Sequence, residues 1–322
     1  MRALRPILLL ILGLVALAAP ARAEIGKLLT PQDLAPLVER HEVLVLDVRA
    51  TSPVGGLSPY VAGHIQDAVA SPAALWNGPA ENPGLLPDEE TLRKLVNDAG
   101  IDGSRPVVIV HEGKDAADLG GAARVYWTLK VVSVERVAIL NGGMTAWRAA
   151  GLPVSSAPVA VTRADVRIDP ESSLMATREE VEAQLATPEG ERLIDARPEE
   201  FFWGKRWHDA AKRPGTIRGA ESFPYTRWFV DGGPLIAGPE AARRIAAENG
   251  LDTAPVTIFF GNVGEGAAID WFALSELAGM PGVKLYPGSM VDWSKADLPM
   301  DHVPGTLEML WLSTQRWLAA TF

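Results

Sequence analysis

The six residues LVLDVR at positions 44–49 recur in pattern as RLIDAR at positions 192–197. Each is an apolar strand that ends in Asp-x-Arg, so Asp47 and Arg49 match Asp195 and Arg197. A second pair of segments, LNGGMTAW at 140–147 and YPGSMVDW at 286–293, repeats in the same way. The offset is 148 residues for the first pair and 146 for the second, which predicts a duplicated domain.

Apolar strands alternate with amphipathic helices in each copy. This order predicts an α/β fold of two tandem domains, each a mostly parallel sheet with helices on both faces. We place the domains at 24–155 and 171–322, with a linker at 156–170 where Pro and Ser interrupt helical periodicity. The predicted strands are 43–47, 107–110, 136–140, 192–195, 256–260 and 283–286. Three predicted helices begin at 30–31, 87–88 and 177–178. Four more cover 117–130, 143–150, 239–249 and 267–278.

The first 23 residues have the pattern of a secretory signal peptide. Arg2 and Arg5 precede an apolar run at 7–19, and Ala-Arg-Ala follows at 21–23. This run is shorter than the roughly 20 residues that cross a bilayer, and no later run is long enough for a membrane span. We therefore expect export to the periplasm and a mature chain that begins near Glu24.

Composition excludes several classes of function. Removing residues 1–23 takes away three Arg and no acidic residue, so the net charge falls from −10 to −13. This balance argues against nucleic acid, or an anionic membrane, as the main partner. The chain has no cysteine, and its five His show no metal-ligand spacing, so we expect neither a metal site nor a cofactor.

Two strand-to-loop junctions are candidate sites, because ligands of open α/β sheets bind beyond the carboxyl ends of the strands. The junction after Phe260 is rich in glycine and leads into a helix, which offers backbone N–H groups to an anion. It holds no Ser, Thr, Cys, His or Lys, and a plain tight turn is the alternative interpretation. The candidate ligand-binding loop consists of Gly261, Asn262, Val263, Gly264, Glu265 and Gly266.

The junction after Val110 carries several titratable side chains. His111 beside Glu112 is a candidate general base, and a solvated polar loop is the interpretation that the sequence favours.

Residues 201–218 concentrate five cations and four aromatic rings in an acidic protein. Two interpretations stay open: a pocket mouth that attracts a small anion, or a surface loop whose rings cover a core edge. The candidate anion-attracting residues are Lys205, Arg206, Lys212, Arg213 and Arg218.

The C-terminal segment has the apolar spacing of an amphipathic helix. We expect this apolar face to dock onto its own domain, and a partner-binding helix is the alternative. The face consists of Leu307, Leu310, Trp311, Thr314, Trp317 and Leu318.

These motifs together resemble the tandem rhodanese family of thiosulfate sulfurtransferases. The resemblance rests on the duplicated Asp-x-Arg, the RPGTIRGA turn at 213–220, its counterpart GHIQDA at 63–68, and the two Gly-Gly/Ser-Met-x-x-Trp turns. The helix that begins GGAARVYW at 120–127 also resembles the first-domain helix of that family.

The resemblance implies that a catalytic cysteine should begin the second-domain loop, and this chain has Gly261 there. One branch of the family has Tyr-Cys-Asn-Thr-Gly-His-Trp-Ala-Ala at this loop. Asn262 and Gly264 match that stretch, whereas Glu265 replaces the His and Gly266 replaces the Trp. Without a thiol the family mechanism cannot operate, so we expect a pseudoenzyme with the fold and pocket of a sulfurtransferase.

Three functions follow from this comparison. The first is a non-catalytic periplasmic protein that binds a small anion, a sulfur species or a protein partner. The second is an enzyme of another mechanism that uses Glu265 or the pair His111 and Glu112. The third is a structural or interaction protein that uses the C-terminal helix.

Overall fold

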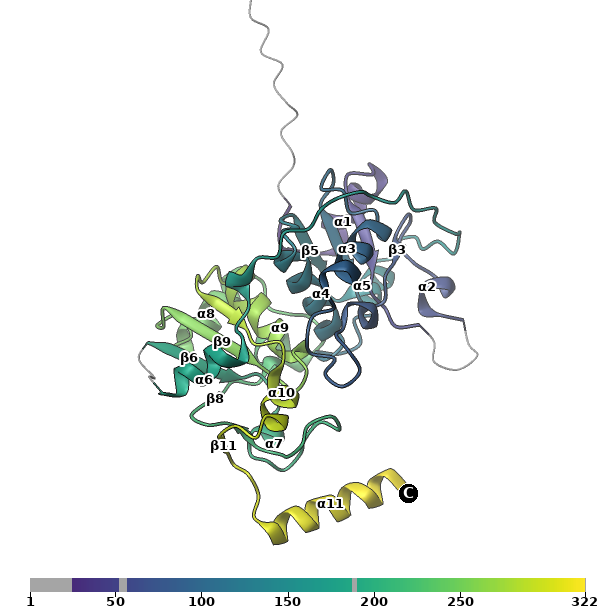
Figure 1. Ribbon diagram of the computed structural model, residues 1–322. Coiled ribbons are helices and arrows are strands. Elements are labelled where there is room, and N and C mark those ends of the chain that lie inside the picture. Colours follow the sequence, from purple (N-terminus) through teal and green to yellow (C-terminus); the bar gives the residue numbers. More distant parts are fainter. Residues whose placement is uncertain (1–24, 52–56, 187–189, 322) are drawn as a thin grey trace, which may run out of the picture.

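The computed structural model describes residues 25–51, 57–186 and 190–321, so the predicted signal peptide at 1–23 lies outside the described residues. Two α/β domains lie side by side (Figure 1). The first holds a sheet of order β1-β5-β4-β2-β3, and the second a sheet of order β10-β9-β6-β8. The strand pairs recorded in both sheets are parallel, which confirms the predicted fold class.

All six predicted strands are present, within one residue of the predicted bounds at each end. The five strands that the sequence did not predict are only two residues long, too short to show a periodic pattern. The strands are β1 (Leu28–Leu29), β2 (Leu44–Asp47), β3 (Val69–Ala70), β4 (Val107–Val110), β5 (Val137–Leu140), β6 (Glu191–Asp195), β7 (Thr216–Ile217), β8 (Glu221–Ser222), β9 (Val256–Phe260), β10 (Val283–Leu285) and β11 (Met300–Asp301).

The helices begin where capping residues predict them to begin. Thr30 caps α1 through a reciprocal pair of hydrogen bonds with Asp33, and Thr177 makes the same arrangement with Glu180. The helices are α1 (Pro31–Glu39), α2 (Pro59–Ala62), α3 (Glu89–Asp98), α4 (Leu119–Val131), α5 (Gly143–Ala149), α6 (Arg178–Ala186), α7 (Glu199–Phe202), α8 (Pro239–Glu248), α9 (Glu265–Trp271), α10 (Ser289–Lys295) and α11 (Thr306–Thr321). Residues 272–277 extend α9 as a π-helix, and residues 156–171 form neither helix nor strand.

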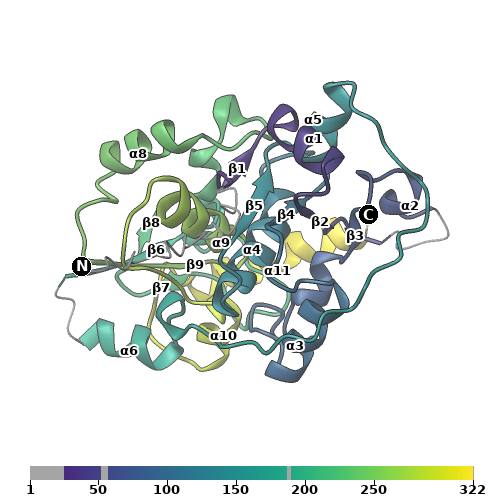
Figure 2. The same ribbon diagram turned by 90° about the horizontal axis from the view of Figure 1, so that it is seen from above.

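One continuous apolar core joins the two domains. Helix α4 of the first domain and helix α9 of the second lie between the two sheets (Figure 2). The ring of Tyr126 on α4 lies edge-on to Phe272, 4.8 Å between centroids, and its hydroxyl donates to Glu276 Oε2 at 2.5 Å. Because both helices are buried almost all round, the domains form one packed unit rather than two loosely linked ones.

The prediction that α11 docks onto its own domain through its apolar face is wrong. Leu307 is 84% exposed, and Leu310 and Trp311 are 67% and 62% exposed. The helix instead contacts the second domain through its other face, where Arg316 forms an ion pair with Asp209. No helix of the described residues is both long and apolar enough to cross a membrane.

Candidate functional site

The candidate loop lies at the carboxyl end of β9, in the middle of the second sheet. Glycine is required at 264, where φ is +84°, a left-handed conformation that side chains other than glycine rarely adopt. The loop is held from the side by the turn that begins α10. Gly261 N–H donates to Ser289 Oγ at 3.0 Å, and Met290 N–H donates to Gly261 O at 3.0 Å. The repeated Gly-Gly/Ser-Met motif therefore supports the loop in this domain through Ser289 and Met290.

A cavity of about 250 Å³ opens beside this loop, between the two domains. Its walls come from the loop, from the start of α4 in the first domain, and from the segment that follows β6. Gly120 of α4 lies so close to the loop that a Cβ on it would be 3.2 Å from Glu265 Cβ. The lining residues are Ala117, Gly120, Arg197, Pro198, Phe201, His208, Tyr225, Gly261, Asn262, Val263, Glu265, Gly266 and Ile269.

Position 261 has room for a side chain that it lacks. A Cβ built on Gly261 would be 3.7 Å from Ala267 N and 3.9 Å from Gly264 N, which is ordinary van der Waals contact. The first hydrogen bond of α9 runs from Ala268 N–H to Gly264 O at 2.8 Å. The N–H groups of residues 265–267 are therefore first-turn donors without a partner in the helix. The empty space at 261 adjoins a set of backbone donors.

Gly266 is required for a different reason. A Cβ there would come within 2.9 Å of the ring of Tyr225, so the ring closes one side of the cavity against the loop. Burial raises the pKa of the Tyr225 hydroxyl, and the carboxylates of Asp115, Asp270 and Glu265 raise it further. Tyr225 is therefore a neutral hydroxyl beside the loop at ordinary pH.

Arg197 connects the repeated Asp-x-Arg motif to the cavity. Its guanidinium pairs with Asp195 at 2.6 Å, is almost fully buried, and also donates to Gly215 O at 2.8 Å. The remaining nitrogen, Nη1, lies 3.3 Å from Asn262 Oδ1 in the loop. Asp195 largely neutralises this cation, so Arg197 acts mainly as a rigid hydrogen-bond donor that positions Asn262.

A second arginine, Arg124 on α4, lies behind the loop and is completely buried. Its Nη2 donates to Gly84 O at 2.6 Å, whereas Nε and Nη1 have no hydrogen-bond partner. A Cβ on Gly264 would be 2.7 Å from Nη1, which places the guanidinium directly against the loop backbone. Burial lowers the pKa of Arg124 to about 10, and the negative charge of Glu265 acts in the opposite direction. The exposed carboxylate of Glu265 thus favours the charged form of Arg124.

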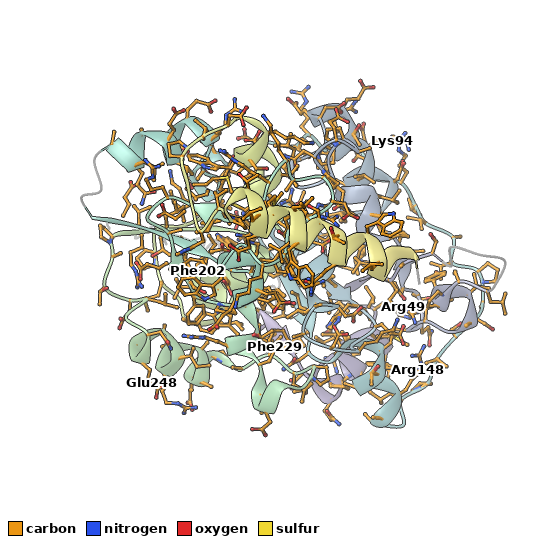
Figure 3. The ribbon with its side chains drawn as sticks, turned by 90° about the horizontal axis from the view of Figure 1, so that it is seen from below. Arg49, Lys94, Arg148, Phe202, Phe229 and Glu248 are labelled. Atoms are coloured by element: carbon orange, nitrogen blue, oxygen red, sulfur yellow. The ribbon has the colours of Figure 1, made fainter. Side chains whose placement is uncertain are left out.

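The loop of the first domain is closed by its own side chains. His111 follows β4 as Gly261 follows β9, and its carbonyl accepts from Met144 N–H as Gly261 O accepts from Met290. The ring is 2% exposed, and Nδ1 lies 2.9 Å from Asp118 Oδ2. Glu112 accepts from Arg49 at 3.1 Å and from Arg148 at 2.7 Å (Figure 3 labels both arginines). The buried ring of His111 shows that the favoured interpretation, a solvated polar loop, is wrong for this residue. The carboxylate of Glu112 is bound by two arginines.

The segment 201–218 contributes aromatic rings to the cavity rather than cations. Phe201 and His208 line it, and burial lowers the pKa of His208 while Glu265 opposes that shift. The five candidate cations lie elsewhere. Arg206 pairs with Glu200 at 2.9 Å, Lys212 with Asp297 at 2.5 Å and Arg218 with Asp301 at 3.7 Å. Arg213 donates to Leu298 O at 2.9 Å, and Lys205 lines a separate cavity beside α11.

Sequence reasoning missed two residues of the site. Tyr225 lies outside every motif quoted above. Arg124 lies in the segment 120–127, which indicated the family but no binding role, and only the fold brings both residues to the loop. Among the described residues, no group of three or more His, Cys, Asp or Glu could hold a metal ion.

Comparison with known proteins agrees with the fold and the repeat. The model of the "Rhodanese-like domain" family matches residues 30–150 and 177–296. A Mycobacterium bovis protein named "Putative thiosulfate sulfurtransferase 1" is 31% identical over 245 residues, 73% of this chain and 84% of that protein. The 3-mercaptopyruvate sulfurtransferase of Escherichia coli is 29% identical over 280 residues, 84% of this chain and 96% of the relative.

Solved structures agree at the level of the fold. The anaerobic ergothioneine biosynthesis enzyme of Chlorobium limicola superposes with a TM-score of 0.73 at 20% identity, over 87% of this chain and 71% of that chain. The family match covers both halves of the repeat, and the full sequence contains no cysteine for the thiolate chemistry that the family's sulfurtransferases use. This chain therefore belongs to the rhodanese family, as a tandem of two rhodanese-like domains without a cysteine.

Proposed function

We propose that this protein is a non-catalytic member of the rhodanese family that binds a small anion, such as a sulfur oxyanion, in the cavity beside Gly261–Gly266. The observation that carries the proposal is the space at position 261. It adjoins first-turn backbone N–H groups of α9, and the chain has no thiol to occupy it. A protein that kept the loop only as a turn would have no need of a cavity there.

Arg124 supplies a second argument for an anion. A fully buried guanidinium with two unpaired nitrogens is costly unless negative charge approaches it. Glu265 provides part of that charge from the loop, but it is exposed and therefore screened by water. An anion held by the loop N–H groups would add negative charge near the same guanidinium.

We further propose that the protein works in the periplasm, on the basis of the signal-peptide pattern in residues 1–23. The absence of any cysteine leaves the protein inert toward the disulfide-forming chemistry of that compartment.

Isothermal titration with thiosulfate tests the binding proposal. We expect binding by the wild type and loss of binding in Gly261→Val, whose side chain fills the space beside Ala267 N. Gly238→Val is the matched control, because a Cβ at that helix-capping glycine meets no atom within 4 Å and the site lies outside the cavity. Equal affinity of Gly261→Val and wild type, or no binding by the wild type of thiosulfate, sulfite or sulfate, would overturn the proposal.

Glu265→Gln sharpens the test. Thiosulfate is a dianion, so removing a carboxylate about 6–8 Å from it, at an effective dielectric constant of about 40, favours binding by about 2 kcal/mol. The dissociation constant for thiosulfate should then fall by about tenfold or more. A weaker affinity for thiosulfate in this variant would contradict binding of the anion beside Glu265.

A further inference from the structure

The outer face of α11 is an exposed apolar stripe. We define the α11 stripe as Leu307, Leu310, Trp311, Thr314, Trp317 and Leu318. Its five apolar members are 84%, 67%, 62%, 62% and 44% exposed, in chain order. Figure 1 shows α11 at the lower end of the molecule, with no other labelled element below it.

The inner face of α11 fixes the direction in which the stripe points. Met309, Leu312 and Arg316 on that face are partly buried. The Arg316 guanidinium lies 4.7 Å from the ring centroid of Trp207 and pairs with Asp209. Because Arg316 holds the helix to the second domain, the stripe cannot turn inward without breaking both contacts.

The stripe is large for a monomer surface. With ordinary side-chain areas, the recorded exposures leave about 600 Å² of apolar surface on this one helix face. Patches on monomers are about 300–600 Å² at their largest, and a standard interface buries about 800 Å² per partner. The stripe therefore supplies most of the area that one side of a stable dimer needs.

The spacing of the stripe favours another helix as the partner. Its positions repeat after seven residues, as 307, 310, 311 and then 314, 317, 318, which is the pattern of a helix-packing seam. The only charged residues of the helix, Glu308 and Arg316, lie off the stripe, so two stripes meet without charge repulsion. A second copy of the chain brings the same patch, and a two-fold axis lets both patches close on each other.

A lipid surface fits less well. Helices that lie in membrane interfaces carry Lys or Arg along their polar face, whereas α11 has one Arg, already paired with Asp209. The predicted mature chain has a net charge of −13, from 27 basic and 40 acidic residues, and anionic lipid repels it.

We propose that the α11 stripe is the interface of a symmetric homodimer, in which the α11 helices of two copies pack against each other in antiparallel orientation. This proposal does not depend on the proposed ligand, because the stripe and the loop cavity share no residue.

Sedimentation velocity of the full mature chain, from about 1 to about 100 µM, tests the dimer. We expect the wild type to pass from monomer to dimer over this range. Leu310→Glu should raise the dissociation constant about tenfold or more, because two carboxylates would be buried at the interface. Leu75→Glu is the matched control, since Leu75 is 53% exposed on the first domain, and it should dimerise as the wild type does.

A cysteine-free chain also allows an unambiguous cross-linking test. Thr314→Cys, near the middle of the stripe, should form a covalent dimer under mild oxidation, whereas Gln315→Cys, beside the stripe, should do so more slowly. A wild type that stays monomeric at about 100 µM, with equal cross-linking of both variants, would overturn the proposal. So would a monomer that sediments with phosphatidylcholine vesicles and loses this ability in Leu310→Glu, since the stripe would then be a lipid-binding face.

Discussion

A cysteine introduced at position 261 should restore sulfur acceptance, because the structure has kept the space and the donors. The new Cβ meets Ala267 N at 3.7 Å and Gly264 N at 3.9 Å, and the backbone at 261 is not left-handed. We therefore expect Gly261→Cys to fold with little loss of stability. Its thiolate would attack the outer sulfur of thiosulfate, forming a persulfide as the sulfur–sulfur bond breaks and sulfite leaves with the electron pair.

The reactivity of this thiol depends on two opposed charges. The N-terminus of α9, equivalent to about half a positive charge at about 4 Å, stabilises the thiolate by about 1 kcal/mol at an effective dielectric constant of about 40. The carboxylate of Glu265, at about 6–8 Å, destabilises it by a similar amount. The thiol pKa of Gly261→Cys should thus stay at about 8.5, and adding Glu265→His should lower it by about one unit.

The assay has two readouts. The pH dependence of iodoacetamide alkylation gives the thiol pKa, and intact mass spectrometry after thiosulfate treatment shows the addition of one sulfur atom. At about pH 7.5 the thiolate fraction rises from about 10% in the single variant to about 50% in the double variant, so persulfide should form about fivefold faster. Gly238→Cys is the control: its thiol also precedes a helix but lies outside the cavity. If both 261 variants are folded and gain no sulfur, or if Gly238→Cys gains it equally fast, the idea of a retained anion-binding loop is refuted.

Four further predictions follow. The wild-type protein should show no thiosulfate:cyanide sulfurtransfer above background, because no thiol exists in the chain; turnover that survives repeated purification would require another mechanism. Asp270→Asn should stabilise the protein at about pH 7, with a gain that vanishes near about pH 4, as measured by urea unfolding. Burial raises the pKa of Asp270 well above its ordinary value, so folding stability falls as pH rises above that ordinary value, and Asn removes this loss. Arg124→Met should lower the free energy of unfolding by about 1–3 kcal/mol, since the carbonyls of Gly84 and Leu85 lose their donor. Exported protein should begin near Glu24, and a mass that includes residues 1–23 would contradict the signal-peptide prediction.

The parts of the fold that local patterns specify were predictable from the sequence. The strands that run through the middle of each sheet are continuous apolar segments, and side-chain caps such as Thr30 and Thr177 mark the starts of helices. The two-residue strands were not predictable, because they depend on a neighbouring strand for their hydrogen bonds. The direction of the α11 stripe also depends on a tertiary contact, in which a cation on the other face binds Trp207 and Asp209.

The candidate site was predictable only as far as the loop itself. Glycines at 264 and 266 indicate a curled backbone, but the reason for Gly266 is the ring of Tyr225, some forty residues away in the sequence. The composition of residues 201–218 favours anion binding, yet acidic partners such as Glu200 and Asp297 pair with several of its cations. Charge counted along a sequence does not show which charges are already paired.

The first residue after the central strand differs between the two copies of the repeat: a side chain fills this position in one domain, and the position is empty in the other. In the first domain His111 occupies the position after the strand, and its ring is buried against Asp118. In the second domain Gly261 leaves the same position empty, beside N–H groups that no side chain of the loop occupies. Relaxed selection on a lost active site would allow any small residue at 261, and a filled position like that of His111 would stabilise the domain more. The proposed ligand would occupy the empty space at 261 and so account for a position that no side chain of the loop fills.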